Sequence, residues 1–82
     1  MGLAARERPE RLADKIYQIR DALGLTQSQM RERLKIDYHV GYISLWETGK
    51  SEPPLPVLLR YARCIGISTD VLIDDALDLP TL

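Results

Sequence analysis

The apolar residues in the first third of this chain recur at helical spacing. Four of them lie at i, i+4, i+7 and i+11, on one face of a helix with 3.6 residues per turn: Leu12, Ile16, Ile19 and Leu23. Gly24 follows where a glycine commonly ends a helix. No stretch alternates between apolar and polar residues over the length of a strand. The pattern predicts a first helix that opens near Pro9 and Glu10 and ends before residue 24.

Capping residues, glycines and prolines divide the rest of the chain into four more short helices. Thr26, followed three residues later by Gln29, has the form of a capping box and opens the second. The third is expected over about 41–48, and the fourth over about 55–65 with Pro56 tolerated in its first turn. Ser68 can cap a fifth. The residues expected to face inward are Met30, Leu34, Ile43, Trp46, Leu55, Leu58, Leu59, Ala62, Val71, Leu72 and Ile73.

Length and composition predict one small all-α domain. The chain has 82 residues, of which 45% are hydrophobic and 28% charged, as in ordinary globular proteins. Its apolar runs are far shorter than the roughly 20 residues that a membrane helix needs, and the first nine residues lack the apolar core of a signal peptide. The single cysteine, Cys64, and the single histidine, His39, exclude an internal disulfide and offer neither a zinc site nor a catalytic set. We therefore expect a cytoplasmic protein that is not an enzyme and has no cofactor, metal or small-molecule ligand.

Charge is distributed unevenly along the chain. The first 69 residues hold all 11 basic residues and eight of the 12 acidic ones, a net charge of +3. Residues 70–82 hold the other four acids and no base, a net charge of −4. A mildly basic body with an acidic tail suits a protein with one face toward nucleic acid. The alternative is a solvated tail without a role.

The order of motifs in the middle of the chain is informative. The motifs are Leu25-Thr26-Gln27, Ile43-Ser44-Leu45-Trp46-Glu47-Thr48-Gly49-Lys50 with Pro53 after it, Leu58-Leu59-Arg60-Tyr61-Ala62, Ile65-Gly66-Ile67-Ser68 and Val71-Leu72-Ile73. In this order and spacing, residues 10–75 resemble the lambda-repressor-like helix-turn-helix domain of the Cro/C1 (XRE) type. The resemblance implies a five-helix fold, with residues 1–9 as a flexible arm and 76–82 as an acidic and apolar tail.

The resemblance also implies where DNA would bind. The second and third helices would form the helix-turn-helix, with the third in the major groove and the start of the second on a phosphate. Arg20 and Glu47 match a partly buried salt bridge that braces the first helix against the third. Gln27 is placed to brace the third helix as well as to contact the backbone. The turn at 48–50 commonly touches phosphate through backbone N–H groups and a lysine. The DNA-contacting positions carried over are Thr26, Gln27, His39, Val40, Gly41, Tyr42, Ser44, Leu45, Thr48 and Lys50.

Three departures from the family pattern bear on this interface. Arg31 stands where a small residue is usual, Lys35 stands where glycine is usual, and the turn from Leu34 to Ile43 is two residues longer. We expect Arg31 and Lys35 to add phosphate contacts. The longer turn could also start the third helix one turn earlier, with Asp37 as its N-cap.

The recognition surface is poor in the side chains that usually read bases. Positions 38–46 contain no Arg, Lys, Asn or Gln, whereas Val40 and Leu45 could contact thymine methyl groups. Shape and backbone contacts would then carry more of the specificity. His39 could instead be an exposed loop residue, and Tyr42 could be half-buried packing. Trp46 is expected in the core, and Cys64 as an inert buried thiol.

The sequence favours a sequence-selective regulator of transcription, acting as a repressor and homodimer on double-stranded DNA. The alternatives are a protein-interaction module that keeps the fold without binding DNA, and an antitoxin or restriction–modification controller. The dimer surface is expected at Ile65 and Ile67 with the apolar tail residues Ile73, Leu77 and Leu79, unless that tail folds back on its own domain. Arg6, Arg8 and Arg11 could form a basic arm or a solvated terminus.

Overall fold

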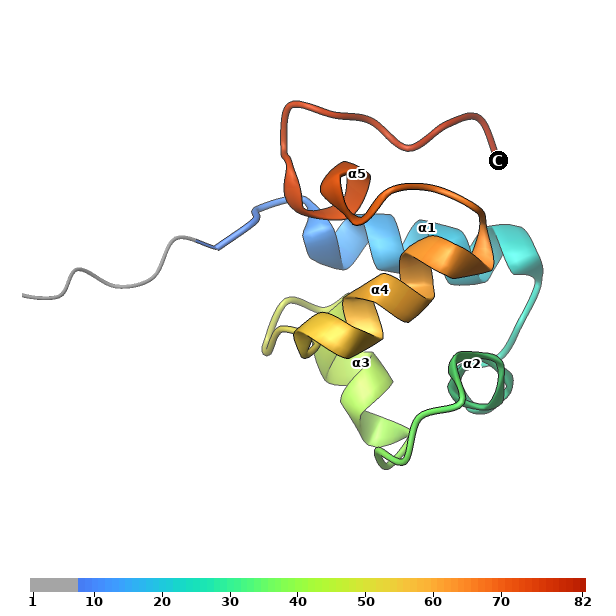
Figure 1. Ribbon diagram of the computed structural model, residues 1–82. Coiled ribbons are helices and arrows are strands. Elements are labelled where there is room, and N and C mark those ends of the chain that lie inside the picture. The colour runs from blue at the N-terminus through green and yellow to red at the C-terminus, as the bar shows by residue number, and fades with distance from the viewer. Residues whose placement is uncertain (1–7) are drawn as a thin grey trace, which may run out of the picture.

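Residues 8–82 are described by a computed structural model and contain five helices and no strand. The helices are α1 (Leu12–Leu23), α2 (Gln27–Leu34), α3 (Gly41–Glu47), α4 (Leu55–Cys64) and α5 (Thr69–Ile73). Helix α1 packs on α3 and α5, and α4 packs on α2 and α5 (Figure 1). Helices α2 and α3 pack on each other. The predicted all-α class is confirmed.

The helix ends are set by the local residues that the sequence indicated. Gly24 ends α1 in the left-handed conformation, with φ of 69°. At the start of α2, the Gln29 N–H donates to Thr26 Oγ1 at 3.1 Å, and the Thr26 N–H donates to Gln29 Oε1 at 2.9 Å. This reciprocal capping box satisfies two of the backbone donors that a helix start leaves open. Ser68 caps α5 by accepting from the Asp70 N–H at 3.3 Å.

One apolar core lies between the helices. The residues of α4 that face this core differ in part from those expected. Leu58 and Ala62 are buried as expected, but Leu55 is 77% exposed and Leu59 40% exposed. Val57 and Tyr61 are buried in their place. The sequence of α4 holds apolar residues on more than one face, so packing against its neighbours decides which face turns inward. In α5, likewise, Leu72 is buried whereas Ile73 is 41% exposed.

The Tyr61 hydroxyl is buried in this core and has no hydrogen-bond partner among the described residues. Burial raises the pKa of this phenol well above its ordinary value. An unsatisfied buried hydroxyl costs about 1–3 kcal/mol. We therefore expect Tyr61→Phe to raise the free energy of unfolding by about 1 kcal/mol in urea denaturation. Tyr17→Phe, at a tyrosine that is 45% exposed, should leave it unchanged. A less stable Tyr61→Phe variant would show that the hydroxyl is hydrogen-bonded in solution.

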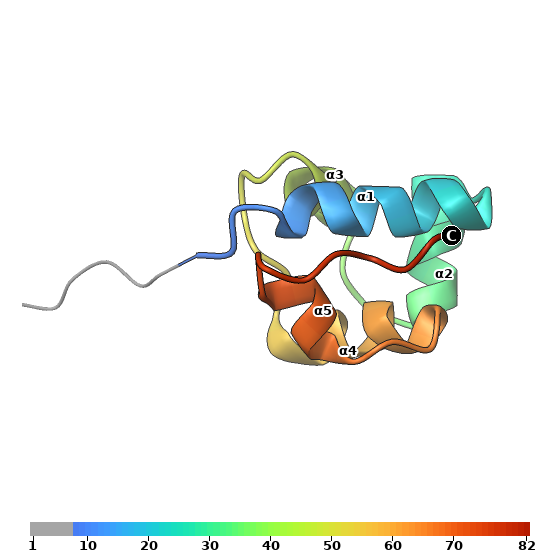
Figure 2. The same ribbon diagram turned by 90° about the horizontal axis from the view of Figure 1, so that it is seen from above.

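The segment after α5 runs back alongside α1 toward the C-terminal end of that helix (Figure 1 and Figure 2). This segment is held by Lys15 of α1, which is only 1% exposed. Its ammonium donates to the carbonyls of Val71, Asp74 and Leu77 at 2.8, 3.0 and 2.8 Å. Of the two alternatives for the tail, the structure therefore shows the one in which it folds back, with Leu79 packed against the core.

A second set of contacts fixes the tail to the start of α1. The Asp75 carboxylate accepts from the Glu10 and Arg11 N–H groups at 2.9 and 3.0 Å, which lowers the pKa of Asp75. The Arg11 guanidinium donates to Asp78 Oδ1 at 2.6 Å. Arg11 is thus engaged by its own chain, and Arg6 of the expected basic arm lies outside the described residues.

Over residues 8–82, none of the helices has the length and apolar character needed to cross a membrane.

Candidate nucleic-acid interface

Glu47, at the end of α3, joins three helices. Its side chain is 5% exposed, and its carboxylate accepts from Arg20 Nε at 2.7 Å and Arg20 Nη2 at 3.0 Å. Gln27 of α2 donates to the same carboxylate through Nε2 at 3.2 Å. The Arg20 guanidinium also donates to the Leu25 carbonyl at 2.9 Å, between α1 and α2. This junction fixes α3 against both α1 and α2. Its hydrogen bonds to Glu47 raise the pKa of Arg20.

The start of α2 lies beside this junction. Thr26 caps the helix, and the backbone N–H groups of Gln27 and Ser28 meet no acceptor in the described part of the chain. Free N–H groups at a helix start, together with the helix dipole, favour an anion such as phosphate. The amide of Gln27, by contrast, is engaged with Glu47, as the bracing role requires.

The outer face of α3 lies opposite its two buried residues, Ile43 and Trp46. Its exposed residues are Gly41, Tyr42, Ser44, Leu45 and Thr48. The Thr48 hydroxyl donates to the Ser44 carbonyl at 2.8 Å, and the Gly41 N–H donates to Nδ1 of His39 at 3.0 Å. Val40 precedes the helix and is half-buried. Tyr42 is 45% exposed, so its side chain is available on this face.

Two helices joined by a turn, with the second exposed along one face, form the arrangement that the sequence motifs indicated. The helix-turn-helix family model matches residues 16–72, more than half of the chain. The chain belongs to the XRE-type helix-turn-helix family. No curated protein matches it. Among solved structures, it is similar to the P22 c2 repressor protein in complex with a synthetic operator. The two chains are 23% identical with a TM-score of 0.68, and the match covers 78% of this chain and 94% of that one. The expected lambda-repressor-like fold is confirmed.

The turn of this helix-turn-helix is longer than usual and is held by side chains of α2 and α4. Arg31 donates through Nε to the Tyr38 carbonyl and lies 4.0 Å from Asp37. Lys35 ends α2 in the left-handed conformation, with φ of 55°, where glycine is the easier residue. Arg60 of α4 donates to the carbonyls of Leu34 and Lys35, with 3.0 Å to Leu34. No pattern in the sequence indicated this role of Arg60.

Helix α3 begins at Gly41, as the helix pattern predicted, and not one turn earlier with Asp37 as its N-cap, which was the alternative that the longer turn left open. The extra residues instead bring Tyr38 onto the aromatic side chains of α3. Its ring centroid lies 5.4 Å from that of Tyr42 and 5.6 Å from that of Trp46. This edge-to-face packing of a partly exposed ring helps to hold the segment before Gly41 in the turn.

The turn after α3 was expected to contact phosphate through backbone N–H groups and a lysine, but these N–H groups are engaged within the protein. The backbone N–H groups of Thr48, Gly49 and Lys50 already donate to carbonyls of α3, at 3.1, 3.4 and 3.0 Å. The Lys50 ammonium is exposed and makes no hydrogen bond or ion pair within residues 8–82. In this turn, it is therefore the group best able to reach a phosphate.

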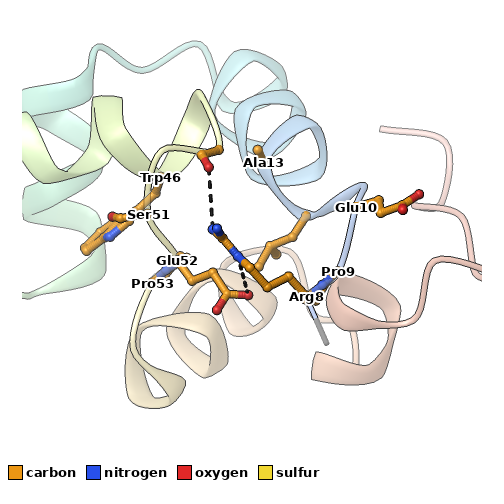
Figure 3. A pocket seen from close by; sticks show the side chains of 10 residues that line it. Arg8, Pro9, Glu10, Ala13, Trp46, Ser51, Glu52 and Pro53 are labelled. Atoms are coloured by element: carbon orange, nitrogen blue, oxygen red, sulfur yellow. Dashed lines mark hydrogen bonds and ion pairs between the residues drawn. The ribbon is translucent and has the colours of Figure 1, made fainter. Parts of the chain in front are cut away.

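Arg8, which lies just before α1, contacts the turn after α3. It donates to the Gly49 carbonyl at 3.5 Å and lies 3.6 Å from the Glu52 carboxylate, across the pocket between the start of α1 and the segment after α3 (Figure 3). Arg8 is thus engaged with its own chain.

Proposed function

We propose that this protein is a sequence-selective transcriptional regulator that binds double-stranded DNA with α3 in the major groove. The observation that carries the proposal is the buried Glu47 junction. It holds the open N–H groups of α2 and the exposed face of α3 in one fixed orientation. A reading helix and a phosphate contact need such an orientation to engage the same duplex. Support also comes from the fold shared with the P22 c2 repressor, a protein solved in complex with a synthetic operator.

The direct test is selection from random duplex DNA with the purified protein, at near-physiological and at higher salt. A palindromic enriched motif would support a dimeric sequence-selective regulator. Salt-sensitive binding without a motif would mean that phosphate contacts dominate and would contradict sequence selectivity. Absence of binding at either salt would overturn the proposal.

We propose that the protein binds as a homodimer through the corner between α4 and α5, around Ile65, Ile67 and the exposed Ile73. Ile65 and Ile67 are only partly buried in the single chain, so association would cover more of their surface. Half-sites separated by about one helical turn, roughly 34 Å, are the expected geometry. Sedimentation of the protein with and without operator tests this state. We further propose that it acts as a repressor, which a promoter–reporter assay tests.

Lys50→Gln is expected to weaken binding about equally for all DNA sequences. The ammonium would meet a phosphate, so its removal should lower the slope of log K against log salt by about 0.9 per contact. Fluorescence anisotropy titrations over a range of salt concentrations measure both effects. Arg63→Gln removes the same charge from α4, outside the helix-turn-helix, and should leave the slope unchanged. A loss confined to one operator sequence would show that Lys50 reads bases instead.

A protein-interaction module is the second candidate, and the surface of α3 favours it. Residues 36–49 contain no Lys or Arg, whereas Tyr38, Tyr42 and Leu45 are large and exposed. Such a face could also bind another protein. The DNA selection distinguishes the two, because the module would bind no duplex at either salt.

A further inference from the structure

The surface that α3 presents is unusually apolar for a helix that would read DNA. Tyr42 and Leu45 are 45% and 38% exposed and lie three residues apart, on the same face of the helix. Tyr38, in the turn before α3, is 37% exposed and contacts Tyr42. Together the two tyrosine rings and the Leu45 side chain form an exposed, largely apolar surface, which we call the tyrosine–leucine face.

This face is rigid. The rings of Tyr38 and Tyr42 pack against Trp46, with centroids 5.6 and 6.1 Å away, and Trp46 itself is 2% exposed. Arg31 holds the backbone of Tyr38 through its carbonyl. A surface that is already ordered loses little side-chain freedom on binding.

The long polar side chains that commonly read base edges are missing on the same side. Positions 38–46 contain no Arg, Lys, Asn or Gln, so the common bidentate contacts to guanine and adenine are missing there. Nδ1 of His39 and the Thr48 hydroxyl are already bonded to the backbone. In the major groove, the apolar feature that distinguishes a base is the C5-methyl group of thymine.

The charges around the face suit DNA. Lys35 lies before the turn and Lys50 follows α3, and neither has an ionic partner within residues 8–82. An apolar surface that lies between two exposed lysines in the sequence suits a groove that has methyl groups on its floor and phosphates along its edges.

We infer that Tyr42 and Leu45 recognise thymine by contact with its C5-methyl group, and that Tyr38 positions the Tyr42 ring for this contact. The inference rests on the proposed function and deepens it, because it names the chemical group that the helix reads. The sequence suggested Val40 and Leu45 for this role. Val40 is half-buried before the start of α3, whereas Leu45 and Tyr42 are exposed. The bound operator would therefore carry thymines at the positions that face α3.

The test replaces thymine by deoxyuridine, one position at a time, in the duplex enriched by the selection experiment. Deoxyuridine keeps every hydrogen-bonding group of thymine and lacks only the methyl. Each contacted methyl should contribute about four-fold in affinity, as expected for burying one CH₂-sized group. Anisotropy titrations with the unaltered protein should find this loss at one or two positions per half-site.

Two alanine variants test which side chain contacts each thymine methyl group. In Leu45→Ala, the difference in affinity between thymine and deoxyuridine should disappear at the position that Leu45 contacts, and Tyr42→Ala should abolish it at a neighbouring position. Leu55→Ala, at a leucine of α4 that is 77% exposed, is the matched control and should keep the difference. Circular dichroism establishes that each variant is folded. If Tyr42→Ala does not fold, Leu45→Ala and the deoxyuridine series still decide the question.

The outcomes separate this inference from the proposed function. Selective binding with equal affinity for thymine and deoxyuridine at every position would overturn methyl recognition and leave the regulator intact. Persistence of the difference in both variants would overturn the assignment to Tyr42 and Leu45. Absence of binding to any duplex would overturn the proposed function and the inference together.

Discussion

Replacing Glu47 with alanine is expected to lower the free energy of unfolding by about 3–5 kcal/mol, because it leaves the Arg20 charge partly buried without its partner. The Arg20 and Glu47 side chains are only 17% and 5% exposed, so water cannot replace the lost contacts in full. Gln27 would lose its acceptor as well. Small domains have a total stability of roughly 5–15 kcal/mol, so much of this variant should be unfolded at 37 °C. Urea denaturation followed by circular dichroism measures the change.

Two further variants make this result specific to the buried pair. Arg20→Met combined with Glu47→Leu removes both charges and should recover most of the lost stability, since apolar residues often replace a buried ion pair at little cost. Glu32→Ala removes an exposed carboxylate of α2 and should change the free energy of unfolding by less than about 0.5 kcal/mol. If Glu47→Ala were as stable as the parent, the ion pair would not hold the three helices together in solution.

Replacing Lys15 with methionine is the second change with a large expected effect. Methionine keeps an unbranched chain but removes the ammonium, which donates to three carbonyls of α5 and the tail. Hydrogen bonds to a charged group contribute about 1.5–3 kcal/mol each and do not add fully within one cluster. We expect a loss of about 2–4 kcal/mol in the free energy of unfolding. Because the carbonyls can regain water if the tail detaches, residues 74–82 should also exchange their amide hydrogens faster.

Hydrogen exchange measured by mass spectrometry locates this effect. Faster exchange should be confined to the tail and α5, with the capped start of α2 unchanged. Lys50→Met, at an exposed lysine, is the control and should leave both stability and exchange as in the parent. Lys15→Arg keeps the charge but adds a larger planar group to a site with 1% exposure, and should also destabilise the protein. A Lys15→Met variant with parental stability and a protected tail would refute the role given to this lysine.

The local structure and the family could be predicted from the amino-acid sequence. The spacing of Leu12, Ile16 and Ile19 placed the buried face of α1, and the capping box at Thr26 placed the start of α2. These features depend on residues within a few positions of each other, so a linear pattern contains them. The motif from Ile43 to Lys50 indicated the helix-turn-helix family, which the family comparison confirms.

Features that depend on contacts between distant residues could not be predicted in this way. Leu55 and Leu59 of α4 are exposed, whereas Val57 and Tyr61 are buried, because α2 and α5 select one of several apolar faces of that helix. The burial of Lys15 depends on carbonyls at least 56 residues away, which no local pattern reveals.

The turn between α2 and α3 also depends on residues that are distant in the sequence. This turn is held by Arg31, by Arg60 at its beginning and by the ring contact of Tyr38 with Trp46, rather than by a cap at Asp37. Local sequence determines where helices can begin and end, because capping and periodicity act over a few residues. Which face is buried, and what holds an irregular segment, is determined by the partners that the folded chain brings together.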